Sequence, residues 1–212
     1  MITNIFMANK TAEHKKLKIL AAADIHGSKD IAEKLAAKAE KNNVDLVILA
    51  GDIHGMFDTE GVIGPFKKRK QKVVFVPGNW DSSMESELLS HVYGIKNIDN
   101  YYVTYKDNAI IGIGSPDFQL SLDERKAFKN LKKNFERIKS KGKRILVSHL
   151  HAAGTKAEKT GFRGSTALRK AIDEFKPDIF IAGHIHEAEG IEELIGKTKV
   201  FQIGEKGKII VI

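Results

Sequence analysis

The sequence has no cysteine, one tryptophan and four prolines among its 212 residues. Without cysteine the chain can form neither disulfides nor thiolate metal sites, which is typical of proteins in a reducing cytoplasm. No apolar stretch reaches the roughly 18–20 residues that a membrane helix needs, and the first residues lack the apolar core of a signal peptide. We therefore expect a soluble, cytoplasmic protein in which nitrogen and oxygen atoms bind any metal ion.

The composition is that of an ordinary globular protein, with 42% hydrophobic and 29% charged residues. Residues 1–16 are polar and aperiodic and are expected to form a mobile N-terminal tail, followed by a single domain over residues 17–212. The net charge of +8 favours anionic partners, although a lysine-rich chain without cysteine is also typical of heat-adapted proteins. No sequence feature indicates an oligomeric state.

Short apolar runs of strand character alternate with helical segments, which predicts an α/β fold. The strand-like runs that matter most span residues 17–23, 44–50, 73–76, 145–147 and 179–182. Residues 101–105 and 109–113 predict a hairpin with Asp107 and Asn108 as its turn, and two short strands are expected near residues 200–203 and 208–212.

Helices are predicted from their capping residues and apolar faces. Ser28 is the expected N-cap of one helix, and Ser82 with Glu85 forms the capping-box pattern of another. The longest helix is expected over residues 121–141, with a second capping box at Ser121 and Glu124. A further helix should stop before Pro177.

Each of the five apolar runs ends in residues that can bind a metal ion. In an open α/β sheet, ligands bind outside the carboxyl ends of the strands, so these side chains should converge. Seven donors are too many for one tetrahedral zinc ion but suit two divalent ions that share a bridging carboxylate. We expect Mn²⁺ first, with Fe, Zn, Co or Ni as alternatives that the ligand types do not separate. The donors are Asp24, His26, Asp52, Asn79, His149, His184 and His186.

The order of these motifs resembles that of the calcineurin-like metallophosphoesterase superfamily. The motifs are Asp24-x-His26, Gly51-Asp52, Gly78-Asn79-x-Asp81, His149-x-His151 and Gly183-His184-x-His186. The resemblance implies a four-layer αββα sandwich of two mixed β-sheets flanked by helices, and a dinuclear-metal phosphoesterase. It assigns Asp24, His26 and His186 to the first ion and Asn79, His149 and His184 to the second, with Asp52 as the bridge.

One position departs from that family pattern, because Trp80 stands where the family usually has histidine. The family histidine is thought to protonate the leaving oxygen, and an indole N–H cannot supply an acidic proton. We therefore expect hydrolysis of phosphodiesters or activated phosphoesters, by a metal-bound hydroxide, in preference to unactivated monoesters. Trp80 itself is interpreted either as a stacking surface for an aromatic group of the substrate or as a packed wall residue.

Other side chains are candidates for supporting roles. His54 and His151 are candidates for proton transfer, or for orienting a ligand. Asp81 is a candidate for contacting the substrate or supporting the metal ligands, or simply for capping the helix near Ser82. Arg163 lies in a flexible glycine-containing basic loop that could bind a substrate phosphate.

Three functions remain open at this stage. The first is hydrolysis of a small phosphoester. The second is a nuclease with the same dimetal centre, supported by the basic residues 67–70 and the basic face of the 121–141 helix, although nucleic acid is the less favoured partner. The third is a non-catalytic scaffold of the same fold.

Overall fold

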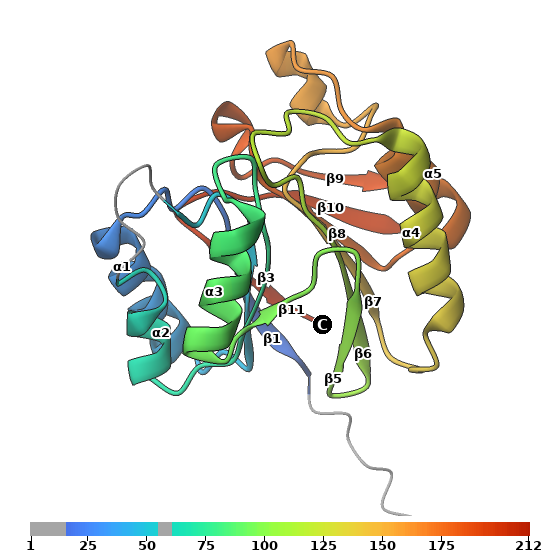
Figure 1. Cartoon of the computed structure of the whole chain (residues 1–212). Coiled ribbons are helices and arrows are strands. Elements are labelled where there is room, and N and C mark those ends of the chain that lie inside the picture. The colour runs from blue at the N-terminus through green and yellow to red at the C-terminus, as the bar shows by residue number, and fades with distance from the viewer. Residues whose placement is uncertain (1–15, 55–60) are drawn as a thin grey trace, which may run out of the picture.

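The protein is described by a computed structural model that covers residues 16–54 and 61–212. The expected N-terminal tail lies outside the described residues except for Lys16. Within the described residues, no helix has the length and apolar character needed to cross a bilayer. Two β-sheets lie face to face, with helices on their outer sides (Figure 1).

The first sheet has five strands in the order β11-β1-β2-β3-β4. Its strands are β1 (Lys18–Ala22), β2 (Leu46–Ala50), β3 (Val73–Val76), β4 (Lys96–Asn97) and β11 (Lys208–Val211). Strands β1 to β4 are parallel, and β11 is antiparallel to β1. The carboxyl ends of β1, β2 and β3 therefore lie at one edge of this sheet.

The second sheet has six strands in the order β5-β6-β7-β8-β10-β9. Its strands are β5 (Tyr102–Tyr105), β6 (Asn108–Ile113), β7 (Arg144–Ser148), β8 (Ile179–Ala182), β9 (Glu192–Ile195) and β10 (Thr198–Gln202). The four central strands are parallel, whereas β5 and β9 pair antiparallel at the two edges. Both sheets are therefore mixed.

The helices form the two outer layers. They are α1 (Lys29–Lys41), α2 (Gly64–Lys68), α3 (Ser83–Tyr93), α4 (Glu124–Arg137) and α5 (Thr166–Phe175), with short 3₁₀ helices η1 (Lys156–Thr160) and η2 (His186–Ala188). Helices α1 to α3 cover the first sheet, and α4 and α5 cover the second (Figure 1).

The alternation of side chains along each strand builds three apolar layers. In β1, Ile19 and Ala21 point between the two sheets, whereas Leu20 and Ala22 pack against the helices. This is the period of two that a strand buried on both faces requires. The expected four-layer αββα sandwich of two mixed sheets is confirmed.

Two local expectations were wrong. The hairpin turn consists of Lys106 and Asp107, because Tyr105 pairs with Asn108. Both turn residues have positive φ, at 44° and 61°, which is the backbone of a type I′ turn and matches the twist of the strands.

The capping box expected at Ser121 is also absent. The N-cap of α4 is Asp123, whose side chain accepts a hydrogen bond from the backbone N–H of Lys126. The Glu124 carboxylate instead accepts hydrogen bonds from Ser165 and Thr166 at the start of α5, and so joins the two helices. The capping box of Ser82 and Glu85 and the N-cap Ser28 are confirmed.

The position of the α4 cap can be tested by stability measurements. Asp123→Ala should lower the free energy of unfolding by about 0.5–2 kcal/mol, because it removes the acceptor for an end N–H. Ser121→Ala is the matched control and should change it by less than about 0.5 kcal/mol. Urea denaturation measures both, and an equal loss in the two variants would contradict this assignment.

Candidate metal centre

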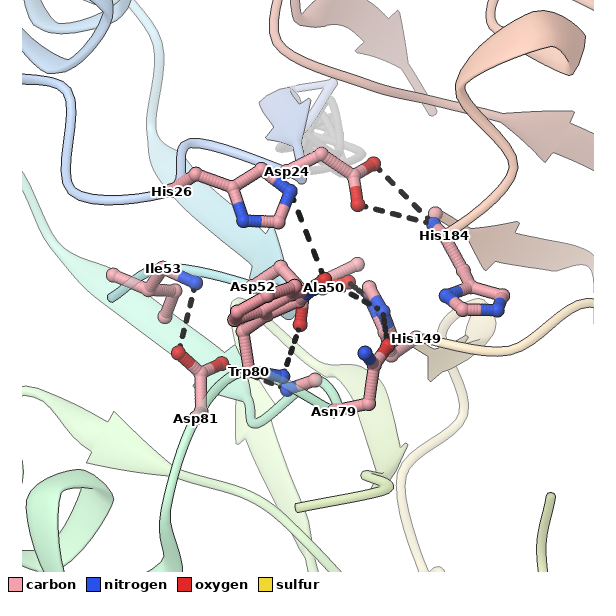
Figure 2. A network of polar contacts seen from close by, with 12 residues as sticks. Asp24, His26, Ala50, Asp52, Ile53, Asn79, Trp80, Asp81, His149 and His184 are labelled. Atoms are coloured by element: carbon pink, nitrogen blue, oxygen red, sulfur yellow. Dashed lines mark hydrogen bonds and ion pairs between the residues drawn. The ribbon is translucent and has the colours of Figure 1, made fainter. Parts of the chain in front are cut away.

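The loops after five strands bring seven polar side chains to one edge of the sandwich, and Figure 2 labels all of them except His186. The first sheet contributes Asp24 and His26 after β1, Asp52 after β2 and Asn79 after β3. The second sheet contributes His149 after β7, and His184 and His186 after β8. Backbone hydrogen bonds continue between these loops, for example from His26 N to Asp52 O at 2.9 Å and from Gly183 N to His149 O at 3.0 Å. The predicted convergence is present.

Asp24, His26 and His186 form one group of potential ligands, with donor atoms within 4.8 Å of one another. Asp24 is buried, and its Oδ1 lies 3.6 Å from His186 Nε2. The imidazoles are open to solvent, since the His26 side chain is 33% exposed and that of His186 is 60% exposed. This group forms the accessible side of the cluster.

Asp52, His149 and His184 form a second, more buried group, with donor atoms again within 4.8 Å. His149 is fully buried, and its Nδ1 lies 2.9 Å from the carbonyl oxygen of Ala50. Because a carbonyl only accepts, that nitrogen carries a proton. His149 Nε2 faces Asp52 Oδ2 at 3.3 Å and Asn79 Oδ1 at 3.0 Å. Three electron-pair donors can meet in this way only around a proton or a cation.

Asp52 lies between the two groups. Its Oδ2 is 3.8 Å from His26 Nε2 in the first group and 3.3 Å from His149 Nε2 in the second. Its Oδ1 accepts a hydrogen bond from the backbone N–H of Trp80 at 2.9 Å, which fixes the plane of the carboxylate. Asp52 is thus placed where a carboxylate bridging two ions would lie.

Burial is the largest influence on the pKa values of Asp24, His26 and His184. Burial raises the pKa of Asp24 to about 6, against the opposing effect of His149. Burial lowers the pKa of His184 to about 4, so this imidazole is neutral at pH 7 and has a free lone pair. Burial also lowers the pKa of His26. Divalent metals bind imidazoles that are neutral and carboxyl groups that are deprotonated.

For Asp52 and His149, contact with each other outweighs the effect of burial on the pKa. Burial acts to raise the pKa of Asp52, but the hydrogen bond and charge of His149 outweigh it, and the pKa is lowered. Burial acts to lower the pKa of His149, but contact with Asp52 outweighs it, and the pKa is raised. The contact between the two side chains therefore favours the charged form of each.

Strained backbone aims several of these side chains into the cluster. Four donors have positive φ, which is uncommon for residues with a Cβ atom. The φ angles are 58° for Asp24, 46° for His26, 51° for Asp52 and 71° for His184. Such strain persists only where neighbouring contacts hold it in place, and it often marks functional sites.

Two glycines allow the loops to approach closely enough. A Cβ atom on Gly51 would lie 2.6 Å from His149 Cγ, and one on Gly78 would lie 2.9 Å from Asp52 Cγ. Gly51 also has a φ of 91°. Both distances are shorter than a real Cβ contact, so these positions have no room for any side chain.

Asp81 joins the loops that follow β2 and β3 and does not cap α3, whose N-cap is Ser82. Its Oδ1 accepts hydrogen bonds from the backbone of Ile53 and His54 and from His54 Nδ1, at 2.7–2.9 Å. Its Oδ2 accepts one from Gly78 N at 2.7 Å. Asp81 is buried, and His54 is its side-chain partner. This pair holds Asp52 and Asn79 in register.

The remaining predicted residues lie around this cluster. His151 is buried, with its Nε2 donating to the carbonyl of Phe162 at 3.2 Å. Arg163 is exposed in the segment that follows. The 3₁₀ helix η1 orders that segment, and Glu158 accepts hydrogen bonds there from Gly154 N and Gly164 N. Trp80 is 42% exposed at the rim of the cluster.

Sequence reasoning missed two residues beside the cluster. Gln202 is buried, and its side-chain N–H donates to the carbonyl of Gly183, immediately before His184. Phe118 lies against Trp80, with the ring centroids 6.4 Å apart. Neither residue belongs to a motif at a strand end. Only the position of Gln202 at the end of β10 could have suggested its role.

The sequence and the fold both match known proteins. A family model described as calcineurin-like phosphoesterase matches residues 17–188. Because this range is most of the chain, the protein belongs to the calcineurin-like phosphoesterase family. No curated protein matches the sequence.

Several solved structures share the fold at low sequence identity. The protein TT1561 of Thermus thermophilus is 16% identical, with a TM-score of 0.73 over 92% of this chain and 99% of that chain. A dimetal phosphatase from Danio rerio is 13% identical, with a TM-score of 0.59 over 89% and 88%. A novel archaeal phosphodiesterase is 19% identical, with a TM-score of 0.54 over 92% and 100%.

The close contact at Gly51 can be tested with a matched glycine. Gly190 has a φ of 90°, but a Cβ atom there meets no atom within 4 Å. Gly51→Ala should lower the free energy of unfolding by roughly 1–3 kcal/mol more than Gly190→Ala, because only the former collides with His149. Chemical denaturation provides the comparison, and similar losses in the two variants would show that the loops are not tightly packed.

Proposed function

We propose that the protein is a dinuclear-metal phosphoesterase that hydrolyses phosphodiesters or activated phosphoesters. The observation that carries this proposal is the position of Asp52 between two groups of metal donors. Asp24, His26 and His186 would hold one ion, and Asn79, His149 and His184 the other, with Asp52 shared. Among similar structures, one is described as a dimetal phosphatase and another as a phosphodiesterase.

The donor set fits divalent metals with a preference for nitrogen and oxygen, and we expect Mn²⁺, with Fe, Zn, Co or Ni as alternatives. Two such ions in one site bind the phosphate oxygens and make a bound water more acidic. The fit of the site to a metal ion rests on His149. Its Nδ1–H donates a hydrogen bond to Ala50, so its Nε2 lone pair faces two oxygen atoms.

The protein itself contributes preorganisation. The Trp80 N–H orients Asp52, the Ala50 carbonyl orients His149, and the His184 N–H contacts both oxygens of Asp24 at 3.3 Å. Hydrogen bonds behind the ligands fix their direction and commonly change metal affinity or activity by 10- to 100-fold when they are lost. The Asp81–His54 pair also holds the loops after β2 and β3.

The substrate preference follows from what Trp80 lacks. Its indole N–H is not acidic, and its backbone N–H is already used by Asp52. His54 is buried with Nδ1 bound to Asp81, and we propose that it positions the loop rather than transferring a proton. His151 is likewise buried and bound to a carbonyl. Substrates with a good leaving group need acid help least.

The two alternatives are less well supported. Within the basic run at residues 67–70, Arg69 forms ion pairs with Glu33 and Glu40, so it is not free to bind a nucleic-acid backbone. The scaffold is favoured by one observation, the exposed apolar residues Met84, Leu88 and Val92 on α3. Because the donor set of the cluster is complete, we place hydrolysis first.

The experiment compares Asp52→Asn with Asp30→Asn, which makes the same chemical change at an exposed position of α1. In the presence of Mn²⁺, Asp52→Asn should lower the hydrolysis of an aryl phosphodiester by at least about 100-fold, since one bridging charge is lost. Asp30→Asn should retain full activity. The wild-type protein should hydrolyse the diester faster than the matching alkyl monoester.

Circular dichroism of both variants shows whether the fold is kept. Full hydrolysis by a folded Asp52→Asn variant would contradict the mechanism. If the wild-type protein hydrolyses neither ester with any of the five metals, the scaffold becomes the better interpretation.

A further inference from the structure

Two large aromatic side chains are exposed beside the metal cluster. Trp80 is 42% exposed and Phe118 is 78% exposed, although burying such rings is normally favourable. The rings of His26, Trp80 and Phe118 form a row of edge-to-face contacts. The centroids are 6.0 Å apart with 86° between the ring planes in the first pair, and 6.4 Å apart with 67° in the second. The row begins at a metal donor and leads outward, and Figure 2 shows the indole beside the cluster.

The position of Phe118 is maintained at an energetic cost. Asp117 and Phe118 have φ angles of 60° and 61°, a conformation that is rare for a bulky residue. Hydrogen bonds from Phe118 N to Asn79 O and from Asp117 N to Asp81 O, both at 3.0 Å, attach this turn to the loop that carries the metal donor. The Asp117 carboxylate also accepts hydrogen bonds from the backbone and side chain of Ser83.

This strain does not serve the core, because the Phe118 ring stays in solvent. Residues held in strained conformations by several contacts often belong to binding sites. The accessible donors of the cluster, His26 and His186, lie on the side from which a phosphate group can enter. Because the His26 ring contacts Trp80, a group attached to that phosphate would pass over the aromatic row.

We propose that Trp80 and Phe118 form a platform for a nucleobase, or another planar aromatic group, joined to the phosphoester: the planar group stacks on the face of one ring, and the other ring, inclined at 67° to the first, packs against its edge. This inference rests on the proposed function, because it requires the phosphate to lie at the metal cluster. Stacking of one base on aromatic side chains corresponds to roughly 5- to 100-fold in affinity. The platform therefore selects nucleotide-like or aryl phosphoesters over alkyl phosphoesters of the same charge.

The test uses the fact that Trp80 is the only tryptophan of the chain, so its fluorescence reports on this position alone. The Mn²⁺-loaded protein is titrated with AMP and with ribose 5-phosphate, which carries the same phosphate without a base. AMP should change the fluorescence saturably and bind about 5- to 100-fold more tightly than ribose 5-phosphate.

Variants separate stacking from an effect on the fold. Phe118→Ala and Trp80→Ala should weaken AMP binding, measured by calorimetry, by at least about 5-fold and leave ribose 5-phosphate unaffected. Trp80→Phe should largely restore binding. Since the contact of Trp80 with Asp52 is made by the backbone N–H, these substitutions keep it. Leu194→Ala, which truncates another exposed apolar side chain on β9, is the control and should bind AMP normally.

Equal affinity for AMP and ribose 5-phosphate, or AMP binding that is unchanged in both alanine variants, would overturn the platform. Its failure is distinguishable from that of the proposed function. Hydrolysis that requires Asp52 without any preference for AMP removes the platform alone. Base-selective binding without hydrolysis of any phosphodiester supports the platform and removes the proposed function.

Discussion

The structure depends on one electrostatic constraint, which is that several electron-pair donors are forced together in a buried place. The Nδ1–H of His149 donates a hydrogen bond to the carbonyl oxygen of Ala50. The Nε2 lone pair of the same ring faces the oxygens of Asp52 and Asn79. Burial of the cluster raises the pKa of Asp24 to about 6 and lowers that of His184 to about 4. Divalent cations, if bound, would balance the charge of the carboxylates and accept the lone pairs of the neutral imidazoles.

Contacts elsewhere in the fold keep the strained backbone of these donors in place. Four of the donors have positive φ, and such residues cost roughly 1–3 kcal/mol each. Backbone bonds between adjacent loops, the Asp81 carboxylate and the side chain of Gln202 maintain the strained loops. The two sheets, packed through a continuous apolar layer, keep the contributing strand ends at one edge. Stability elsewhere in the sandwich therefore supports the geometry of the candidate site.

Much of this could be predicted because strands and strand ends leave a clear pattern. Apolar runs followed by Asp, Asn or His predicted an α/β fold and the convergence of donors such as Asp24 and His184, and the resemblance of their order to the calcineurin-like family implied the sandwich. What could not be predicted depends on particular tertiary contacts. The hydrogen bond between Asp81 and His54 forms only when folding brings the loops after β2 and β3 together. Phe118 is an exposed aromatic residue with no periodic pattern around it in the sequence. The N-cap of α4 is Asp123 rather than the expected Ser121, because the Glu124 carboxylate forms hydrogen bonds with the start of α5.

The most direct test of the central claim is the number of Mn²⁺ ions bound per chain, measured by elemental analysis of protein loaded with the metal and freed of excess. If Asp52 is shared between two groups of ligands, the purified protein should hold two ions per chain. A His184→Ala variant should hold fewer, since it lacks one donor of the second group. Zero or one ion in the folded wild-type protein would contradict the account.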